Sequence, residues 1–295
     1  MSIYMDKHNL RINIFNDTLS IIEQGWYVAT DGTIVELPSI ERVMQAAQMY
    51  THKICVDKAI QKCKTTEIRV ENKDCVQAAQ QLIDSGYNPA MLNLADLYTP
   101  GGLVEYGSGA QEENLCRRSN LVLSLYQFSK KRIEQYPSLN LKACECQFPM
   151  DELNGGVYSG IVTFFRTTEQ ENSALVPNPF NIPVISVAAI NKPQIGRNGM
   201  IVDRDVEITL EKIRTIFRIG MIKGHDSLVL SAFGCGAFAN PPKHIARLFH
   251  QVIEEEEFKN VFKLIEFAIL DGYRTGLKHN PEGNLKPFLQ EFGLL

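Results

Sequence analysis

The chain has 295 residues, of which 44% are hydrophobic and 22% charged, which suits one large globular domain or a domain with an extension. A net charge of -4 excludes a global attraction to nucleic acid, and no stretch approaches the ~20 apolar residues of a membrane span. Charges within the first ten residues argue against a signal peptide, and seven cysteines without paired spacing indicate free thiols, so we expect a cytoplasmic protein without a metal or cofactor.

The N-terminal part of the chain predicts a helix followed by a hairpin. Residues 15–24 have the pattern of a short helix that Asn16 or Asp17 could cap. Residues 26–37 alternate apolar and polar side chains around Asp31-Gly32, a pair typical of tight hairpin turns.

Further helices and a strand are predicted before residue 90. Ser39 is placed to cap a helix over residues 40–49, and residues 67–71 have the pattern of a strand. A helix is predicted over residues 74–86, where Gly86 can take the left-handed conformation that ends many helices.

The rest of the chain alternates buried strands with amphipathic helices. Continuous apolar runs predict strands at Met91–Ala95, Val184–Ala189, Leu228–Ala232 and Leu264–Leu270. Helices are predicted from about Gln111, over 205–223 with Gly224 as terminator, and after Pro241-Pro242. Pro and Gly concentrate in predicted loops at 99–109, 177–199, 234–242 and 276–287.

This alternation predicts an α/β domain with helices on both faces of a mostly parallel sheet. Ligands of such sheets bind beyond the carboxyl ends of the strands. Two glycine-bearing loops leave predicted strands at that end, so one ligand could be gripped between them.

The first of these loops contains adjacent glycines, Gly101 and Gly102, and is followed by Gln111, Glu112 and Glu113. Adjacent glycines allow a backbone to approach a ligand closely and to turn N–H groups toward an anion. The two acids alone have a simple structural explanation, because carboxylates are favoured in the first turn of a helix. Their position after a glycine loop and a buried strand favours an active site.

The second loop is Gly234-Cys235-Gly236-Ala237-Phe238. It is either a strand-to-helix turn that needs a positive φ or a diphosphate cradle before a helix. Cys235 is a weak candidate nucleophile, because no motif places a histidine beside it; His244 and His250 of the following helix could be surface residues. Phe238 could stack on a sugar or base, or belong to the core.

Two polar residues, Asn93 and Asp96, lie at the end of the first core strand. They could bind sugar hydroxyls or simply satisfy the turn. A carboxylate at Asp96 would repel a diphosphate unless it faced the ribose.

A family resemblance emerges from these motifs. The segments AQEENLCRRS (110–119) and LVLSAFGCGAFANPPKHIARLFHQVI (228–253) are similar to the signature blocks of microbial poly(ADP-ribose) glycohydrolases. NIFNDTLSIIEQGWYV and FKLIEFAILD resemble the family's N-terminal helical segment and its last strand. The resemblance therefore runs from about residue 13 to residue 272.

The resemblance implies a macrodomain-like three-layer α/β/α sandwich with an N-terminal helical extension over residues 1–65 and a catalytic core over residues 66–295. It also implies that Glu113 is the catalytic residue and that Glu112 positions the terminal ribose. The implied contacts of ADP-ribose are Asn93, Gly101, Gly102, Leu103, Val104, Gln111, Gly234, Cys235, Gly236, Ala237 and Phe238.

The family's signature has three consecutive glycines shortly before its Gln-Glu-Glu. The chain departs from this pattern at Leu103, which stands in place of the third glycine, after Gly101 and Gly102. If that position needs a positive φ or a bare backbone, leucine would be strained or obstructive there.

The implied reaction is cleavage of the ribose–ribose O-glycosidic bond in poly(ADP-ribose). Protonated Glu113 would supply a proton to the leaving oxygen and, as the carboxylate, would then activate water. The alternatives are a hydrolase that removes mono-ADP-ribose from an amino acid or nucleobase, and a domain that binds ADP-ribose without cleaving it. The implied partner is poly(ADP-ribose) or an ADP-ribosylated protein.

Overall fold

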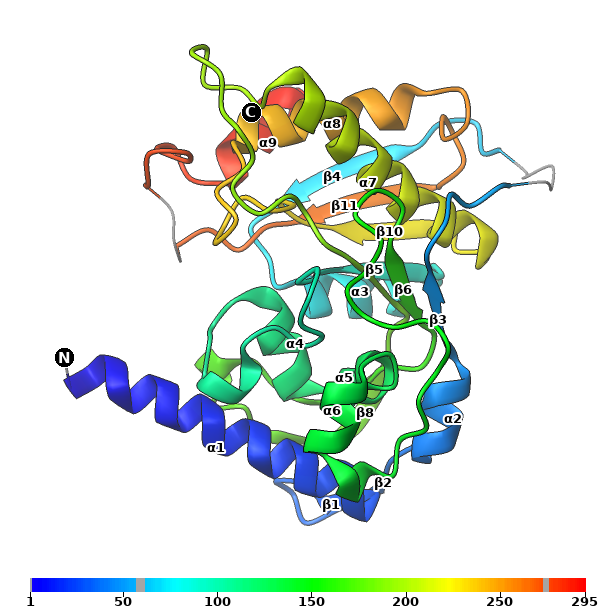
Figure 1. The fold of residues 1–295 in the computed structure, drawn as a ribbon, viewed down its shortest axis with the longest axis vertical. Coiled ribbons are helices and arrows are strands. Elements are labelled where there is room, and N and C mark those ends of the chain that lie inside the picture. Colours follow the sequence, from blue (N-terminus) through cyan, green and yellow to red (C-terminus); the bar gives the residue numbers. More distant parts are fainter. Residues whose placement is uncertain (1, 57–61, 273–275) are drawn as a thin grey trace. The chain divides into compact units, whose positions relative to one another are not determined.

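The computed structural model describes residues 2–56, 62–272 and 276–295 (Figure 1). Its helices are α1 (Ser2–Gln24), α2 (Ile40–Gln45), α3 (Cys75–Asp84), α4 (Gln111–Arg118), α5 (Leu121–Tyr126), α6 (Lys130–Gln135), α7 (Asp203–Ile222), α8 (Pro242–Glu254) and α9 (Leu285–Glu291). Short 3-10 helices are η1 (Val104–Tyr106), η2 (Pro137–Leu139) and η3 (Glu169–Glu171). The strands are β1 (Trp26–Val28), β2 (Ile34–Glu36), β3 (Ala47–Tyr50), β4 (Glu67–Glu71), β5 (Pro89–Leu94), β6 (Gly156–Ser159), β7 (Thr163–Arg166), β8 (Leu175–Asn181), β9 (Val184–Val187), β10 (Ser227–Leu230) and β11 (Leu264–Ala268).

The chain divides into two compact units. Unit 1 comprises Met1–Met49, Ala95–Met150 and Val157–Val184, and unit 2 comprises Tyr50–Leu94, Asp151–Gly156 and Ile185–Leu295. The boundary after residue 65 stays a prediction, and residues 57–61 of the predicted extension lie outside the described residues.

A seven-stranded, mostly parallel sheet has the strand order β3-β6-β9-β5-β10-β11-β4. Strand β10 pairs in parallel with β5 and with β11, and β11 pairs in parallel with β4. The predicted α/β class and the four predicted core strands are thereby confirmed, since they correspond to β5, β9, β10 and β11. Strand β4 has the predicted bounds, 67–71.

Helices cover both faces of the sheet within unit 2 (Figure 1). Successive side chains of β11 point to opposite faces. Phe267 packs against Phe249 of α8 and Phe288 of α9, at ring-centroid distances of 5.2 Å in both cases. Its neighbour Glu266 lies on the other face, in a pocket that residues of α3 also line. The predicted layers of helix, sheet and helix are therefore present.

The N-terminal helix is longer than predicted. Helix α1 spans Ser2–Gln24, so Asn16 and Asp17 lie inside it and the predicted cap is wrong. No proline or glycine interrupts residues 2–24, and the Asp17 carboxylate forms an ion pair with Arg166 instead of capping a helix.

The predicted local signals near the N-terminus are otherwise confirmed. Strands β1 and β2 form the hairpin, with Gly32 at φ +87° in the turn. Ser39 accepts a hydrogen bond from the N–H of Arg42 and so caps α2. Helix α2 ends at Gln45, four residues before the predicted end at residue 49. Gly86, at φ +83°, follows α3.

Part of the predicted loop at 177–199 is a strand. Strand β8 pairs antiparallel with β7 in a separate two-stranded sheet, with Phe164 opposite Phe180 and Arg166 opposite Leu175. The register shifts between these two pairs, so Pro177 and Pro179 lie in the irregular part of the ladder, where a missing N–H is tolerated.

Within the described residues, no helix combines the length and the apolar character that crossing a membrane requires.

Candidate active site

Helix α4 positions the two predicted acids in unit 1. The helix begins at Gln111, as predicted, and no side chain caps it at Ala110. Glu112 and Glu113 therefore lie in its first turn, where the N-terminal end of the helix favours negative charge. Both are buried, with exposed fractions of 3% and 6%.

Both carboxylate oxygens of Glu112 bind the backbone. Oε2 accepts the N–H of Asp96 at 2.9 Å, and Oε1 accepts the N–H of Gly101 at 3.2 Å. The carboxylate of Asp96 accepts the N–H groups of Tyr98 and Thr99, each at 2.8 Å. Asp96 thus accepts the backbone N–H groups of the turn that follows it, which was the predicted alternative to binding sugar hydroxyls.

The two oxygens of Glu113 differ. Oε1 accepts the N–H of Leu103 at 2.9 Å. Oε2 is buried and, within the described residues, has no hydrogen-bond partner. A buried carboxylate oxygen without a partner is costly, so its place in the fold calls for a functional explanation. Oε2 is thus the carboxylate oxygen of Glu113 that no other group of the described residues bonds.

Close approach explains why residues 101 and 102 are glycines. Gly101 and Gly102 have φ values of +75° and +56°, which L side chains rarely adopt. A Cβ on Gly101 would lie 3.2 Å from the ring of Tyr126, and one on Gly102 would lie 2.4 Å from Oε1 of Glu113. Only a glycine lets this backbone lie directly against the carboxylate.

Leu103 is accommodated without strain. Its φ is -104° and its side chain is 54% exposed. The departure from the family's third glycine therefore imposes no backbone strain here. Val104 is fully buried, so its predicted contact with ADP-ribose stays a prediction.

The N–H groups of the glycine loop point inward. The N–H of Gly101 donates to Glu112, and the N–H of Leu103 donates to Glu113. The N–H of Gly102 donates to the carbonyl of Thr99, and the N–H of Val104 donates to the carbonyl of Gly101. The loop is therefore already ordered, and an anion could take these N–H groups only by displacing internal acceptors.

A second group of side chains, around Arg132, forms hydrogen bonds and an ion pair with the glycine loop. Arg132 of α6 is 4% exposed; its Nη2 donates to the carbonyl of Gly102 at 3.2 Å and its Nη1 pairs with Glu105 at 2.6 Å. Tyr136 and Gln135 also donate to Glu105. Burial alone would raise the pKa of Glu105, but the hydrogen bonds and charge of Arg132, with the Tyr136 hydroxyl, lower it overall. The sequence carries no motif for this group.

Helix α1 supports the far end of the same loop. Arg11 forms a bidentate ion pair with Glu169, in which Nε and Nη2 donate to the two carboxylate oxygens at 2.8 and 3.0 Å. Its Nη1 also donates to the carbonyl of Gly107 at 3.4 Å. Arg117 of α4 donates to the carbonyl of Ser108 at 2.7 Å. Burial, together with the charge of Arg11, lowers the pKa of Arg117 to about 10.

The predicted second loop lies in unit 2, ahead of α8. Gly234 has φ +73°, and a Cβ there would lie 2.4 Å from Asn240. The Asn240 amide donates to the carbonyls of Ile190, Gly234 and Phe238, at 2.8, 3.1 and 3.3 Å. Asn240, which the sequence did not single out, therefore fixes the shape of this loop.

The remaining predicted residues of the second loop differ in exposure. Gly236 and Phe238 are partly exposed and Ala237 is exposed, so their surfaces are open to contact. Asn93, at the end of β5 in the same unit, is fully buried and donates to the hydroxyl of Ser186 at 3.0 Å.

Cys235 is not placed as a nucleophile. It is fully buried, and burial raises the pKa of its thiol well above the ordinary value, so the thiol stays protonated. His244 and His250 have other partners, the N–H of Ile201 and the carboxylate of Glu291. His279, which the sequence did not single out, donates through Nε2 to the carbonyl of Cys235 at 2.8 Å.

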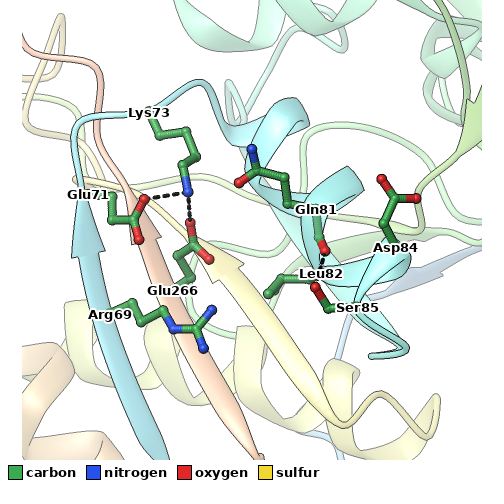
Figure 2. A pocket seen from close by; sticks show the side chains of 8 residues that line it. All are labelled: Arg69, Glu71, Lys73, Gln81, Leu82, Asp84, Ser85 and Glu266. Atoms are coloured by element: carbon green, nitrogen blue, oxygen red, sulfur yellow. Dashed lines mark hydrogen bonds and ion pairs between the residues drawn. The ribbon is translucent and has the colours of Figure 1, made fainter.

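A separate pocket in unit 2 has a volume of about 420 Å³ (Figure 2). Within it Lys73 forms ion pairs with Glu71 and Glu266, and Arg69 pairs with Glu67 at its edge. Its charges thus largely neutralise one another, and the predicted site residues are not among those that line it. The lining residues are Arg69, Glu71, Lys73, Gln81, Leu82, Asp84, Ser85 and Glu266.

Over the described ranges, no group of three or more His, Cys, Asp or Glu side chains is arranged to hold a metal ion. Metal-independent activity stays a prediction.

The chain matches a known protein family. The family described as "microbial-type PARG, catalytic domain", where PARG denotes poly(ADP-ribose) glycohydrolase, matches residues 16–167. This range contains the glycine loop and both glutamates of α4. No curated protein matches the chain.

Solved structures extend the likeness beyond that range. Poly(ADP-ribose) glycohydrolase from Thermomonospora curvata is 25% identical, with a TM-score of 0.74, over 96% of this chain and 99% of that chain. A structure of the same enzyme bound to the inhibitor ADP-HPD is similar in fold. It is 24% identical, with a TM-score of 0.74, over 96% of this chain and 99% of that chain. The Deinococcus radiodurans enzyme in complex with ADP-ribose is 25% identical, with a TM-score of 0.64, over 88% of this chain and 99% of that chain.

Proposed function

Because the chain belongs to the family of microbial-type poly(ADP-ribose) glycohydrolase catalytic domains, we propose that it hydrolyses the ribose–ribose O-glycosidic bond of poly(ADP-ribose) and releases ADP-ribose. The observation that carries the proposal is the pair of glutamates in α4. The backbone holds Glu112 and one oxygen of Glu113, while Oε2 of Glu113 is buried without a partner.

In the proposed reaction Glu113 acts twice. As the acid, it gives the proton on Oε2 to the leaving oxygen while the bond from the anomeric carbon to that oxygen breaks. As the carboxylate, it takes a proton from water while the water oxygen bonds to the anomeric carbon. The proton on Glu113 is thereby restored, and the net change is hydrolysis.

Glu112 has a different role in this proposal. Its carboxylate accepts the N–H groups of Asp96 and Gly101, so it fixes the loop that lies against Glu113. Glu112 thereby prepares the surface that receives the terminal ribose. The second-loop residues of unit 2, Gly234 to Phe238, would bind the diphosphate.

Removal of mono-ADP-ribose from another acceptor is the second candidate function. Leu103 favours it, because the residue bonded to Glu113 carries a side chain that is 54% exposed where the family has a glycine. Such a side chain could restrict the acceptor group that follows the scissile bond.

The deciding experiment compares ADP-ribose release from purified poly(ADP-ribose) by the wild type and by Glu113→Gln. Positioned acid–base catalysis contributes on the order of 10²–10⁴-fold, so the variant should lose at least ~100-fold in kcat while ADP-ribose binding is retained. Glu134→Gln, which changes an exposed glutamate of α6, is the matched control and should behave as the wild type.

Two outcomes would redirect the proposal. If Glu113→Gln kept more than a few per cent of the wild-type kcat, Glu113 would not be the acid. If the wild type bound ADP-ribose but released none from the polymer, mono-ADP-ribosylated protein would be the next substrate to test.

A further inference from the structure

The peptide bond between Gly102 and Leu103 is held at both ends. Its carbonyl oxygen accepts a hydrogen bond from Nη2 of Arg132 at 3.2 Å. Its N–H donates to Oε1 of Glu113 at 2.9 Å. Because a peptide unit is planar, a group that fixes the direction of the carbonyl also fixes the direction of the N–H.

Arg132 is itself rigidly placed. Its Nη1 pairs with Glu105 at 2.6 Å and donates to Gln135 at 2.9 Å, and its guanidinium lies over the ring of Tyr126 at 5.1 Å. The hydroxyl of Tyr136 donates to the same carboxylate of Glu105. Side chains from three elements, α5, α6 and the loop itself, therefore fix the guanidinium on the Gly102 carbonyl.

Resting on the proposed function, we propose that Arg132 is a positioning residue for the hydrolysis. By holding the Gly102–Leu103 peptide it keeps the Leu103 N–H on Oε1 of Glu113, and this directs Oε2 to the scissile bond. Glu105 acts through Arg132, since it bonds the guanidinium.

The positive φ of Gly102, +56°, gives this restraint its importance. A glycine backbone has several accessible conformations of similar free energy, and rotation of the 102–103 peptide would turn the N–H away from Glu113. The charged donor on the carbonyl also polarises the peptide and strengthens its N–H as a donor. Both effects act on the catalytic carboxylate, although Arg132 itself need not touch the substrate.

The chain provides a matched control ion pair, between Arg218 of α7 and Glu257. Arg218 is as buried as Arg132, with 4% of each side chain exposed; it pairs with Glu257 at 2.6 Å and lies over the ring of Phe258 at 5.6 Å. This pair lies in unit 2, whereas Arg132 lies in unit 1. Glu257→Gln therefore weakens a similar ion pair that does not touch the glycine loop.

The test measures kcat and KM on poly(ADP-ribose) for Arg132→Met, Arg132→Lys, Glu105→Gln and Glu257→Gln. Loss of a charged hydrogen bond predicts a fall in kcat of about 10- to 100-fold for Arg132→Met, with KM changed by less than ~3-fold. Arg132→Lys, which keeps a charged donor, should recover part of kcat. Adding Glu105→Gln to Arg132→Met should cost nothing more, because Glu105 acts through Arg132.

A second measurement does not depend on turnover. Amide hydrogen exchange of residues 101–105 should speed up in Arg132→Met and Glu105→Gln, and stay at the wild-type rate in Glu257→Gln. This measurement remains informative if Arg132→Met is poorly folded, because Glu105→Gln changes a side chain that is 16% exposed.

The outcomes separate the two proposals. A wild type that releases no ADP-ribose would reject the proposed function, and the exchange rates would still decide whether Arg132 orders the loop. An active wild type with an unchanged kcat in Arg132→Met would overturn the positioning role alone. A change in KM without a change in kcat would overturn it as well.

Discussion

Gly102 and Glu113 lie so close that a methyl group on Gly102 would stand 2.4 Å from the carboxylate oxygen Oε1 of Glu113. That separation is shorter than any real Cβ contact, and Gly102 also has a positive φ of +56°. The backbone of Gly102 therefore packs directly against the carboxylate of Glu113, and a side chain at residue 102 would displace that carboxylate.

Gly102→Ala should accordingly abolish most activity without unfolding the protein. The new methyl group displaces Glu113, and a displacement of about 1 Å can cost on the order of 100-fold in rate. The measurement is kcat on poly(ADP-ribose), beside the melting temperature. Gly25→Ala is the control for backbone strain, because Gly25 has φ +79° and open space around its Cβ position. Equal losses of activity in the two variants would contradict the clash.

Lys212 of α7 should make folding stability depend on pH. It is 2% exposed, and burial lowers its pKa from 10.5 to about 8, against the smaller opposing effects of Glu152 and Asp151. The unfolded chain then binds the proton more tightly, so this lysine destabilises the fold below pH 8. The destabilisation, on the order of 3 kcal/mol, fades as the pH rises from 8 to 10.5.

Lys212→Met should therefore raise the free energy of unfolding at pH 7 and flatten its rise between pH 8 and 10. Urea titrations at both ends of this range measure the effect. Lys131→Met, which changes an exposed lysine of α6, should leave both values as in the wild type. A destabilised Lys212→Met variant would show that the lysine has a favourable partner in solution.

The cysteines should react with iodoacetamide in the order of their exposure. Cys55 is exposed, whereas Cys116 and Cys235 are buried and burial raises the pKa of both thiols. Mass spectrometry of the native protein should find Cys55 modified first and the other two protected. Rapid labelling of Cys235, with loss of activity, would revive its rejected role as a nucleophile.

Local sequence signals predicted the parts of the fold that local interactions stabilise. Helix α7 was predicted from the spacing of its apolar residues and from Gly224, which terminates it at φ +75°. The first half of α1 was missed for the opposite reason. Its side chains form no strong apolar stripe, and contacts such as that of His8 Nδ1 with the carbonyl of Tyr106, at 3.0 Å, stabilise it from a distant part of the chain.

In the candidate site, too, only the residues that lie close together in the sequence could be predicted. Glu112 and Glu113 follow Gly101 and Gly102 within one short segment, so a motif contains them. Arg132 lies on a different helix, and no pattern in its own segment relates it to the glycine loop. Its relation to Gly102 exists only once the chain has folded.

The ion pair between Arg11 and Glu169 should stabilise the distal half of the glycine loop more than it assists the proposed chemistry. Arg11 also donates to the carbonyl of Gly107, and its guanidinium fills the space where a Cβ on Gly109 would be. Arg11→Met should therefore speed amide exchange over residues 106–109 and lower the melting temperature by a few degrees, roughly 2–8 °C.

Activity provides the contrast in the same variant. The hydrogen bond between Leu103 and Glu113 does not involve Arg11, so kcat should fall by less than ~10-fold. Glu169→Gln should have similar effects on exchange and melting, since it removes the partner of the same pair. Lys7→Met, an exposed change on the same helix, controls for charge. Unchanged exchange over residues 106–109 in Arg11→Met would mean that Gly107 and Gly109 are held by the surrounding backbone alone.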